Sequence, residues 1–177
     1  MDCPEPLIDK LEASFRRFQQ QRLANLPIVN PRLKVQAVGF RAWQGHCLGV
    51  LVTPWFMNLM LLPQTGGEWR ERPPGSKVLH RFPSGSYEFI AGEEEGIGAY
   101  QMCSLFSPMS EFDSQALAVA IAEKVMQELM QEAGHAGDGA REGEPPGAGA
   151  GKPSQRREQR PMSRRALLRG LLLRGEE

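Results

Sequence analysis

Cysteine is scarce in this sequence, and its few cysteines are poorly placed for joint chemistry. Cys3, Cys47 and Cys103 are odd in number and far apart among 177 residues, so a disulfide framework is not expected. His46 precedes Cys47, but adjacent side chains of a strand point to opposite faces and do not readily share one metal ion. No neighbouring Cys and His residues have the spacing of zinc ligands. We therefore expect no metal, no cofactor and no catalytic residue.

Long apolar runs and phosphate-binding glycine motifs are also missing. The stretch 48–62 is too short to span a bilayer and contains Pro54 and Asn58. There is no P-loop and no GxGxxG motif. The N-terminal residues lack the apolar region of a secretory signal. We expect a cytosolic protein without a membrane span.

Net charge is absent as well, but the charges are unevenly distributed. Residues 152–177 hold eight Lys or Arg and three Asp or Glu, a net charge of +5. Subtraction from the totals of 21 and 21 leaves 13 and 18 for residues 1–151, a net charge of −5. An acidic body argues against nucleic-acid binding and favours attraction between the body and the basic tail.

Hydrophobic periodicity predicts one α+β domain at residues 1–132. Apolar residues at helical spacing predict helices at 6–25 and 114–131. Apolar runs bounded by turn residues predict strands at 34–43, 47–53, 57–62, 77–82, 86–91 and 99–106. Short connections favour antiparallel pairing. The expected fold is an α+β two-layer sandwich, with a mainly antiparallel sheet of five or six strands and two helices on one face.

Local patterns add further expectations about these elements. Val38 and Phe40 should share one face of the first strand. Ser110 or Asp113 should cap the second helix. Beyond the domain, residues 133–161 have the composition of a flexible Gly/Pro-rich linker. A basic, leucine-rich tail follows at 162–177.

The stretch 49–63 is the best candidate for a binding surface. Pro54 interrupts a buried strand, which suggests a bent segment near a sheet edge. Large, adaptable side chains follow it. We predict a peptide-binding site made of Trp55, Phe56, Met57 and Met60, joined by Trp69 from a Gly/Pro-rich loop. Core packing is the alternative for each of these residues.

Glu93, Glu94 and Glu95 form an acidic turn with two interpretations. The first is a solvated hairpin loop. The second is a patch that receives arginines of a partner, because Arg pairs well with carboxylates. In the second interpretation, the three glutamates belong to the peptide-binding site.

Several pieces of the sequence together resemble a known family. They are Gly49-Val-Leu-Val-Thr-Pro-Trp55, Leu62-Pro63, Phe82-Pro-Ser-Gly85, Phe89, Gly92-Glu93, Tyr100 and Cys103-Ser-Leu-Phe-Ser-Pro108. In order and spacing, over about residues 5–131, they resemble the HybE family of nickel–iron hydrogenase assembly chaperones, also called HupJ. The ending Arg164-Arg-Ala-Leu-Leu168, with Gly170, resembles the C-terminus of that family.

The resemblance implies a chaperone without enzymatic activity. Such a protein would bind the hydrogenase small-subunit precursor and its twin-arginine signal peptide until export. One alternative is a scaffold that binds the large subunit or other maturation factors without recognising the signal. Another is a thiol-dependent enzyme that uses Cys103 or Cys47 as nucleophile.

The tail itself resembles the arginine part of an export signal. Arg164, Arg165, Leu167 and Leu168 make it a candidate autoinhibitory segment that occupies the peptide site. A disordered end without a role, or a short helix docked on the body, are the alternatives.

Overall fold

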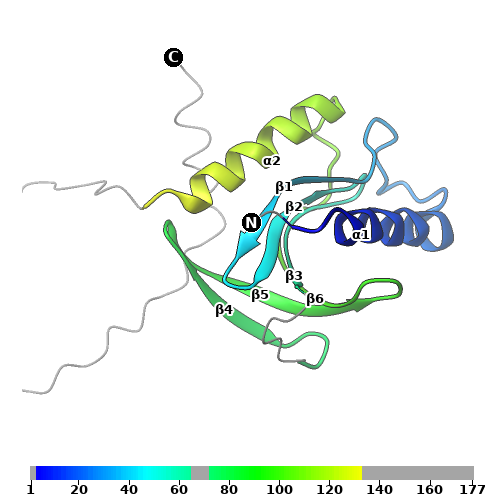
Figure 1. Cartoon of the computed structure of the whole chain (residues 1–177). Helices are drawn as coiled ribbons and strands as arrows, with labels where there is room; N and C mark the ends of the chain where they lie inside the picture. The colour runs from blue at the N-terminus through cyan, green and yellow to red at the C-terminus, as the bar shows by residue number, and fades with distance from the viewer. Residues whose placement is uncertain (1–2, 65–71, 133–177) are drawn as a thin grey trace, which may run out of the picture.

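A computed structural model of the chain describes residues 3–64 and 72–132 (Figure 1). The predicted linker, the tail and Trp69 lie outside the described residues. The elements in chain order are α1 (Glu5–Phe18), the π-helical turn η1 (Gln19–Leu23), β1 (Gln36–Trp43), β2 (His46–Val52), β3 (Met57–Pro63), β4 (Lys77–Phe82), β5 (Gly85–Glu94), β6 (Gly98–Phe106) and α2 (Gln115–Met130).

The predicted α+β fold, with six strands and two helices, is confirmed. The strands form one antiparallel sheet in the order β1-β2-β3-β6-β5-β4. After β3 the chain crosses to the far edge of the sheet, and two hairpins then return it through β4 and β5 to β6. The last strand of the sequence therefore pairs with β3 in the middle of the sheet.

The two helices cover opposite faces of this sheet, which corrects the expectation that they share one face. On β2, Cys47 and Leu51 pack in the same cluster as Leu11 of α1. Leu48 of the same strand packs in the cluster that contains Ala122 of α2. Alternate side chains of a strand point to opposite faces, so β2 and β3 are buried on both sides. Their continuous apolar runs are typical of strands covered on both faces.

A bulge in β1 separates two residues that were expected to share a face. The pairing register of β1 with β2 shifts between Val38 and Arg41. Gly39 lies in this shift with a φ of 65°, a conformation that glycine adopts without a steric penalty. Val38 therefore packs on the α2 side, and Phe40 packs on the α1 side.

The sheet curls around α2 until its two edges approach each other (Figure 1). The ring of Trp43 at the end of β1 stacks on Phe82 at the end of β4, with 5.3 Å between ring centroids. The backbone N–H of Ser84, in the β4–β5 turn, donates to the carbonyl of Leu129 in α2 at 3.3 Å. The curled sheet thus holds α2 along its concave side.

The start of α2 differs by one residue from the prediction. The hydroxyl of Ser114 accepts the N–H of Leu117 at 3.1 Å and caps the helix. Neither Ser110 nor Asp113 has this role. The loop before Ser114 is held by burial of Phe112, so the helix begins later than the sequence pattern suggested.

Cys3 and Cys47 form a disulfide, contrary to expectation. Their Cα atoms are 5.6 Å apart, within the range that disulfides usually span. The pairing depends on the packing of α1 against β2, which a separation of 44 residues in sequence does not reveal. Cys103 is buried and does not take part in this disulfide.

Gly49 on β2 is the position where the sheet is packed most tightly against a ring. A Cβ atom at this position would lie 2.3 Å from the ring of Phe40. We predict that Gly49→Ala lowers the free energy of unfolding by about 1–3 kcal/mol, because the ring must move. Urea denaturation measures the loss. The double variant with Phe40→Leu should be more stable than the sum of the two single losses predicts; simple additivity would contradict this explanation.

Candidate functional site

Pro54 lies in the tight turn that joins β2 to β3. The N–H of Thr53 donates to the carbonyl of Phe56 at 2.8 Å. The Thr53 hydroxyl accepts the N–H of Phe56 at 2.9 Å. Pro54 occupies the second position of this turn, where its restricted φ is favourable. The proline thus marks the end of a hairpin between two interior strands, which corrects the expectation of a sheet edge.

Trp55 and Phe56 enter an aromatic cluster beside α1. The ring of Phe15 contacts Phe56 at 5.7 Å and Tyr100 at 6.0 Å between centroids. Phe18 stacks on Trp55 at 5.9 Å. Trp55 is 9% exposed, whereas Phe56 is only half-buried. Phe56 is therefore the accessible member of the predicted aromatic pair, and Trp55 supports it from within.

Met57 and Met60 are core residues. Neither side chain has exposed surface. Met57 packs on the α2 side of the sheet, and Met60 packs on the α1 side. Met57 and Met60 therefore belong to the core and not to the predicted peptide site. Alternate side chains of a strand point to opposite faces, so one of them enters each core.

The three glutamates of the acidic turn do not share one face. Glu94, at the end of β5, lies on the α1 side together with Tyr100, while Glu93 points to the other side and Glu95 lies in the turn. Burial raises the pKa of Tyr100, and the nearby charge of Glu94 raises it further. Among the described residues, none of the three glutamates forms an ion pair. Strand alternation therefore divides the predicted carboxylate cluster.

The acidic turn rests against α1. A Cβ atom at Gly96 would lie 2.6 Å from the hydroxyl of Ser14 and 3.8 Å from a guanidinium nitrogen of Arg17. Ile97 of the turn packs against the aromatic cluster. The acidic turn and the Pro54 turn, which are far apart in sequence, therefore border the same cluster on the α1 side.

Two exposed apolar residues near the Pro54 turn escaped the sequence reasoning. Leu26 is 44% exposed and Ile28 is 50% exposed. Their loop reaches the turn because the N–H of Asn30 donates to the carbonyl of Pro54 at 2.8 Å. We call Leu26, Ile28 and Phe56 the Pro54 surface. The signal in the sequence was two large apolar residues flanking a proline outside any strand or helix.

Asn30 connects three segments at this end of the molecule. Its side-chain amide donates to the carbonyls of Met109 at 3.0 Å and Phe112 at 2.9 Å. Its side-chain oxygen accepts the N–H of Arg32 at 3.0 Å. The side chain thus holds the loop before α2 and the loop after η1 around the Pro54 turn. Nothing in the sequence distinguished it from an ordinary turn-forming asparagine.

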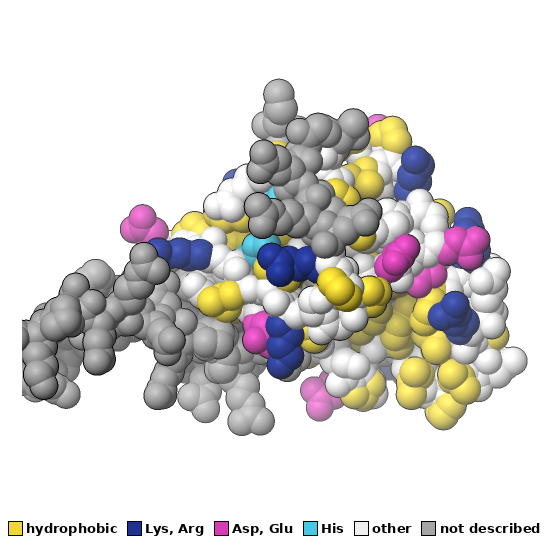
Figure 2. All heavy atoms as spheres, turned by 90° about the horizontal axis from the view of Figure 1, so that it is seen from below, with side chains coloured by type: hydrophobic (Ala, Val, Ile, Leu, Met, Phe, Trp, Pro, Cys, Tyr) yellow, Lys and Arg dark blue, Asp and Glu magenta, His cyan; other side chains and the backbone are white. Residues whose placement is uncertain are grey.

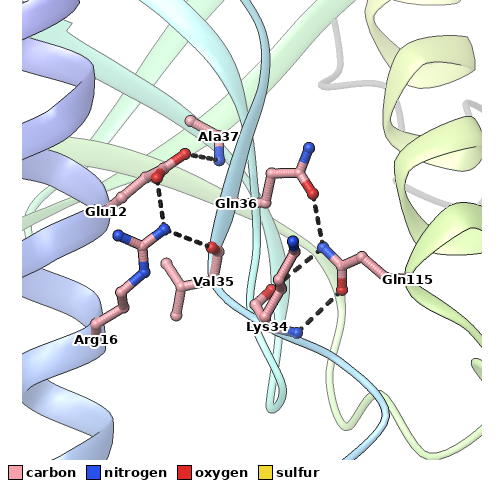
Figure 3. Close-up of polar contacts among 7 residues, drawn as sticks. All are labelled: Glu12, Arg16, Lys34, Val35, Gln36, Ala37 and Gln115. Carbon is pink, nitrogen blue, oxygen red and sulfur yellow. Dashed lines mark hydrogen bonds and ion pairs between the residues drawn. The ribbon is translucent and has the colours of Figure 1, made fainter.

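Both helices bind the segment 34–37, which leads into β1 (Figure 3). On one side, the carboxylate of Glu12 in α1 accepts the N–H of Ala37 at 2.9 Å. On the other side, the side chain of Gln115 in α2 accepts the N–H of Lys34 at 3.0 Å. These contacts set the position of α1 relative to the sheet, and with it the position of the aromatic cluster.

The described residues offer little support for metal or thiol chemistry. No group of three or more His, Cys, Asp or Glu among them is placed to hold a metal ion. Cys47 is in the disulfide and Cys103 is 5% exposed, whereas a reactive thiol needs access and thiolate character. Burial lowers the pKa of His46, and the neighbouring His80 lowers it further. Neither α1 nor α2 is long and apolar enough to cross a membrane.

Comparison with known proteins places this architecture in a family. The family model described as NiFe-hydrogenase assembly, chaperone, HybE matches residues 7–170. The chain is 45% identical over 115 residues to "Probable rubredoxin HupJ" of Rhodobacter capsulatus, a match that spans 65% of this chain and 41% of that protein. It is 40% identical over 131 residues to "Protein HoxT" of Cupriavidus necator, spanning 68% of this chain and 73% of that protein.

A solved structure supports the same fold. The solution structure of HybE from Escherichia coli matches with a TM-score of 0.60 and 22% sequence identity. The match covers 82% of this chain and 91% of the other. At this identity the likeness concerns the fold, that is, the antiparallel sheet with its two helices.

Asn30 provides a test of how the Pro54 turn is held. We predict that Asn30→Asp lowers the free energy of unfolding by about 2–3 kcal/mol, because a carboxylate cannot donate to two carbonyls and leaves them without their donors. Chemical denaturation measures the change. Asn25→Asp is the matched control: Asn25 is exposed and has a φ of 67°, which aspartate tolerates. Similar losses in both variants would contradict the connecting role of Asn30.

Proposed function

Because this chain belongs to the HybE family of NiFe-hydrogenase assembly chaperones, we propose that it binds the precursor of a hydrogenase small subunit together with its twin-arginine signal peptide. Binding takes place in the cytoplasm and lasts until the precursor is ready for export. The role is that of a chaperone without a catalytic step. The observation that carries the proposal is that Phe56 of the Pro54 surface and Ile97 of the acidic turn pack against one cluster.

The chemistry of the signal matches these two features. A twin-arginine signal presents an arginine pair followed by an apolar stretch. Glu94 and Glu95 supply carboxylates for the arginines, whose planar guanidinium groups pair well with carboxylates. The Pro54 surface supplies apolar contact area for the stretch that follows. Compared with the sequence-based site, Met57, Met60 and Glu93 leave the contact surface, and Leu26 and Ile28 enter it.

The expected affinity is moderate. Covering the exposed parts of Leu26, Ile28 and Phe56 contributes roughly 3–5 kcal/mol before other terms are counted. The carboxylate–arginine pairs add to this, while the loss of freedom on association subtracts from it. Micromolar dissociation constants fit this balance, and they suit a chaperone that must release its client.

A variant in the Pro54 surface and a control variant on α2 test the role of this surface. We predict that Leu26→Ser combined with Ile28→Ser weakens binding of the small-subunit precursor about tenfold or more, because exposed apolar contact area is lost. Isothermal titration calorimetry with the purified precursor measures this. Leu117→Ser is the matched control, since Leu117 is 43% exposed but lies on α2; it should bind like the unmodified chain.

The same titration distinguishes recognition of the signal peptide from binding to another part of the precursor. A precursor that lacks its signal peptide should bind at least tenfold more weakly than the intact precursor. Equal affinity for the two would contradict recognition of the signal. It would favour a scaffold that contacts the folded part of a subunit or other maturation factors.

We also propose that the tail at 162–177 competes with the client for this site. Arg164, Arg165, Leu167 and Leu168 lie outside the described residues, and the family match reaches residue 170. A linker of about 30 residues, of the kind that the composition predicts, has a root-mean-square span of about 30 Å. Tethering at that length gives an effective concentration near a millimolar, so even weak binding of the tail would hinder the client.

Removing the tail tests this competition. We predict that a chain ending at residue 161 binds a twin-arginine signal peptide about tenfold more tightly than the full chain. Fluorescence anisotropy with a labelled peptide measures both affinities. Arg164→Glu with Arg165→Glu should reproduce most of the gain in the full-length chain, because the carboxylates no longer attract the tail. Equal affinities of all three proteins would contradict autoinhibition.

A further inference from the structure

β4 is an edge of the sheet, with one side open among the described residues. It lies last in the strand order, next to β5 only. Its exposed residues are Lys77, Leu79 and Arg81, and the residues between them are half-buried. Leu79 has 52% of its surface exposed, the largest value among the exposed apolar residues. We call Lys77, Leu79 and Arg81 the β4 edge residues.

The backbone groups of the β4 edge residues also face the open side. β4 and β5 are joined by a two-residue turn between Phe82 and Gly85, and the residues flanking such a turn form a hydrogen-bonded pair. Hydrogen-bonded and non-bonded pairs alternate along an antiparallel ladder. The N–H of Ala91 donates to the carbonyl of Ser76 at 2.8 Å, which agrees with this alternation. The N–H and C=O groups of the β4 edge residues therefore point away from β5.

Neither described helix covers the outer face beside this edge. The α1 cluster reaches from β1 to β6 on that face, whereas Ile90 on β5, paired with Lys77, lies outside it and is 38% exposed. Figure 2 looks onto the side where β4, β5 and β6 lie in Figure 1, and it shows basic and apolar side chains there, with acidic ones among them. Basic and apolar contact groups thus accompany the open backbone edge.

A second copy of the chain does not suit this edge. Antiparallel self-pairing centred on Leu79 sets Lys77 of each copy opposite Arg81 of the other. Like charges directly opposite each other destabilise a strand pair, and basic residues are a common means of keeping edges from pairing with themselves. An acidic partner strand would instead meet a positive charge at both positions.

We propose that the β4 edge binds an extended segment of another protein that carries a carboxylate, an apolar and a carboxylate side chain at alternate positions. The segment adds a seventh strand to the sheet through backbone hydrogen bonds. Its carboxylates lie opposite Lys77 and Arg81, and its apolar residue lies opposite Leu79. Lys77 already pairs with Glu88 at 3.4 Å, but this pair is exposed and weak. Arg81 has no ion pair with any described residue.

This surface is separate from the Pro54 surface and does not depend on the proposed function. The Pro54 turn joins β2 and β3, whereas β4 lies at the far end of the strand order. The described part of the chain therefore offers separate surfaces for two partners, or for two parts of one partner.

A titration followed by NMR tests the charge pattern. The probe is a blocked Thr-Glu-Thr-Leu-Thr-Glu-Thr peptide added to the isotope-labelled full chain, and the control peptide has Lys in place of both Glu. We expect amide shifts centred on β4 and an affinity about tenfold higher for the acidic peptide, as two cross-strand ion pairs would give. Lys77→Glu with Arg81→Glu should reverse the preference. Equal affinity for both peptides, or shifts centred elsewhere, would overturn the proposal.

Two variants of one residue test the backbone edge. Leu79→Pro removes an N–H that faces the open side and leaves the ladder with β5 intact, as proline is accepted on edge strands. Leu79→Thr removes the apolar side chain and keeps the N–H. We expect Leu79→Pro to weaken the acidic peptide at least tenfold and Leu79→Thr about threefold. Equal binding by the two variants would overturn strand addition, as would a dimer of the free chain through β4 in sedimentation. The charge reversal stands as an independent test if Leu79→Pro fails to fold.

Discussion

Burial of the β2–β3 hairpin on both faces determines where the other elements of the fold lie. Its residues from Cys47 to Leu62 send alternate side chains into two cores. Two faces need two covers, so α1 and α2 must lie on opposite sides of the sheet. Both helices form hydrogen bonds with the segment 34–37, and these bonds fix the positions of α1 and α2 relative to the sheet (Figure 3). The Pro54 turn connects the two strands of this hairpin. Its Phe56 is accessible at the surface, and the buried strands support the turn.

The two faces of the sheet differ in which side chains are accessible to a partner. On the α2 side, the sheet curls around the helix until Trp43 meets Phe82, and the space is filled. On the α1 side, two turns lie at the margins of the helix, one carrying Phe56 and the other carrying Glu94. Phe15 and Tyr100 join them through ring contacts. A rigid aromatic cluster with accessible apolar and acidic margins suits recognition of a segment that is basic at one end and apolar at the other.

The fold was largely predictable because strand and helix signals are local. All six strands and both helices were confirmed, and the turn residues marked their limits. Predictions failed where long-range packing decides: the bulge at Gly39 moved Phe40 to the other face, and α1 brought Cys3 to Cys47. For the candidate site, the structure changes which of the predicted residues are accessible. Burial of Met57 and Met60 follows from strand alternation across two cores. Asn30, Leu26 and Ile28 became visible only once their loop was placed beside the Pro54 turn.

The proposed function requires that the α1 side of the sheet contacts the client. Hydrogen–deuterium exchange of the full chain, alone and in complex with the small-subunit precursor, tests it most directly, because exchange reports the contact region without substitutions. We expect slower exchange on binding in residues 24–30, 55–56 and 94–97, with α2 unchanged. Slower exchange confined to α2, with none in those three segments, would contradict it.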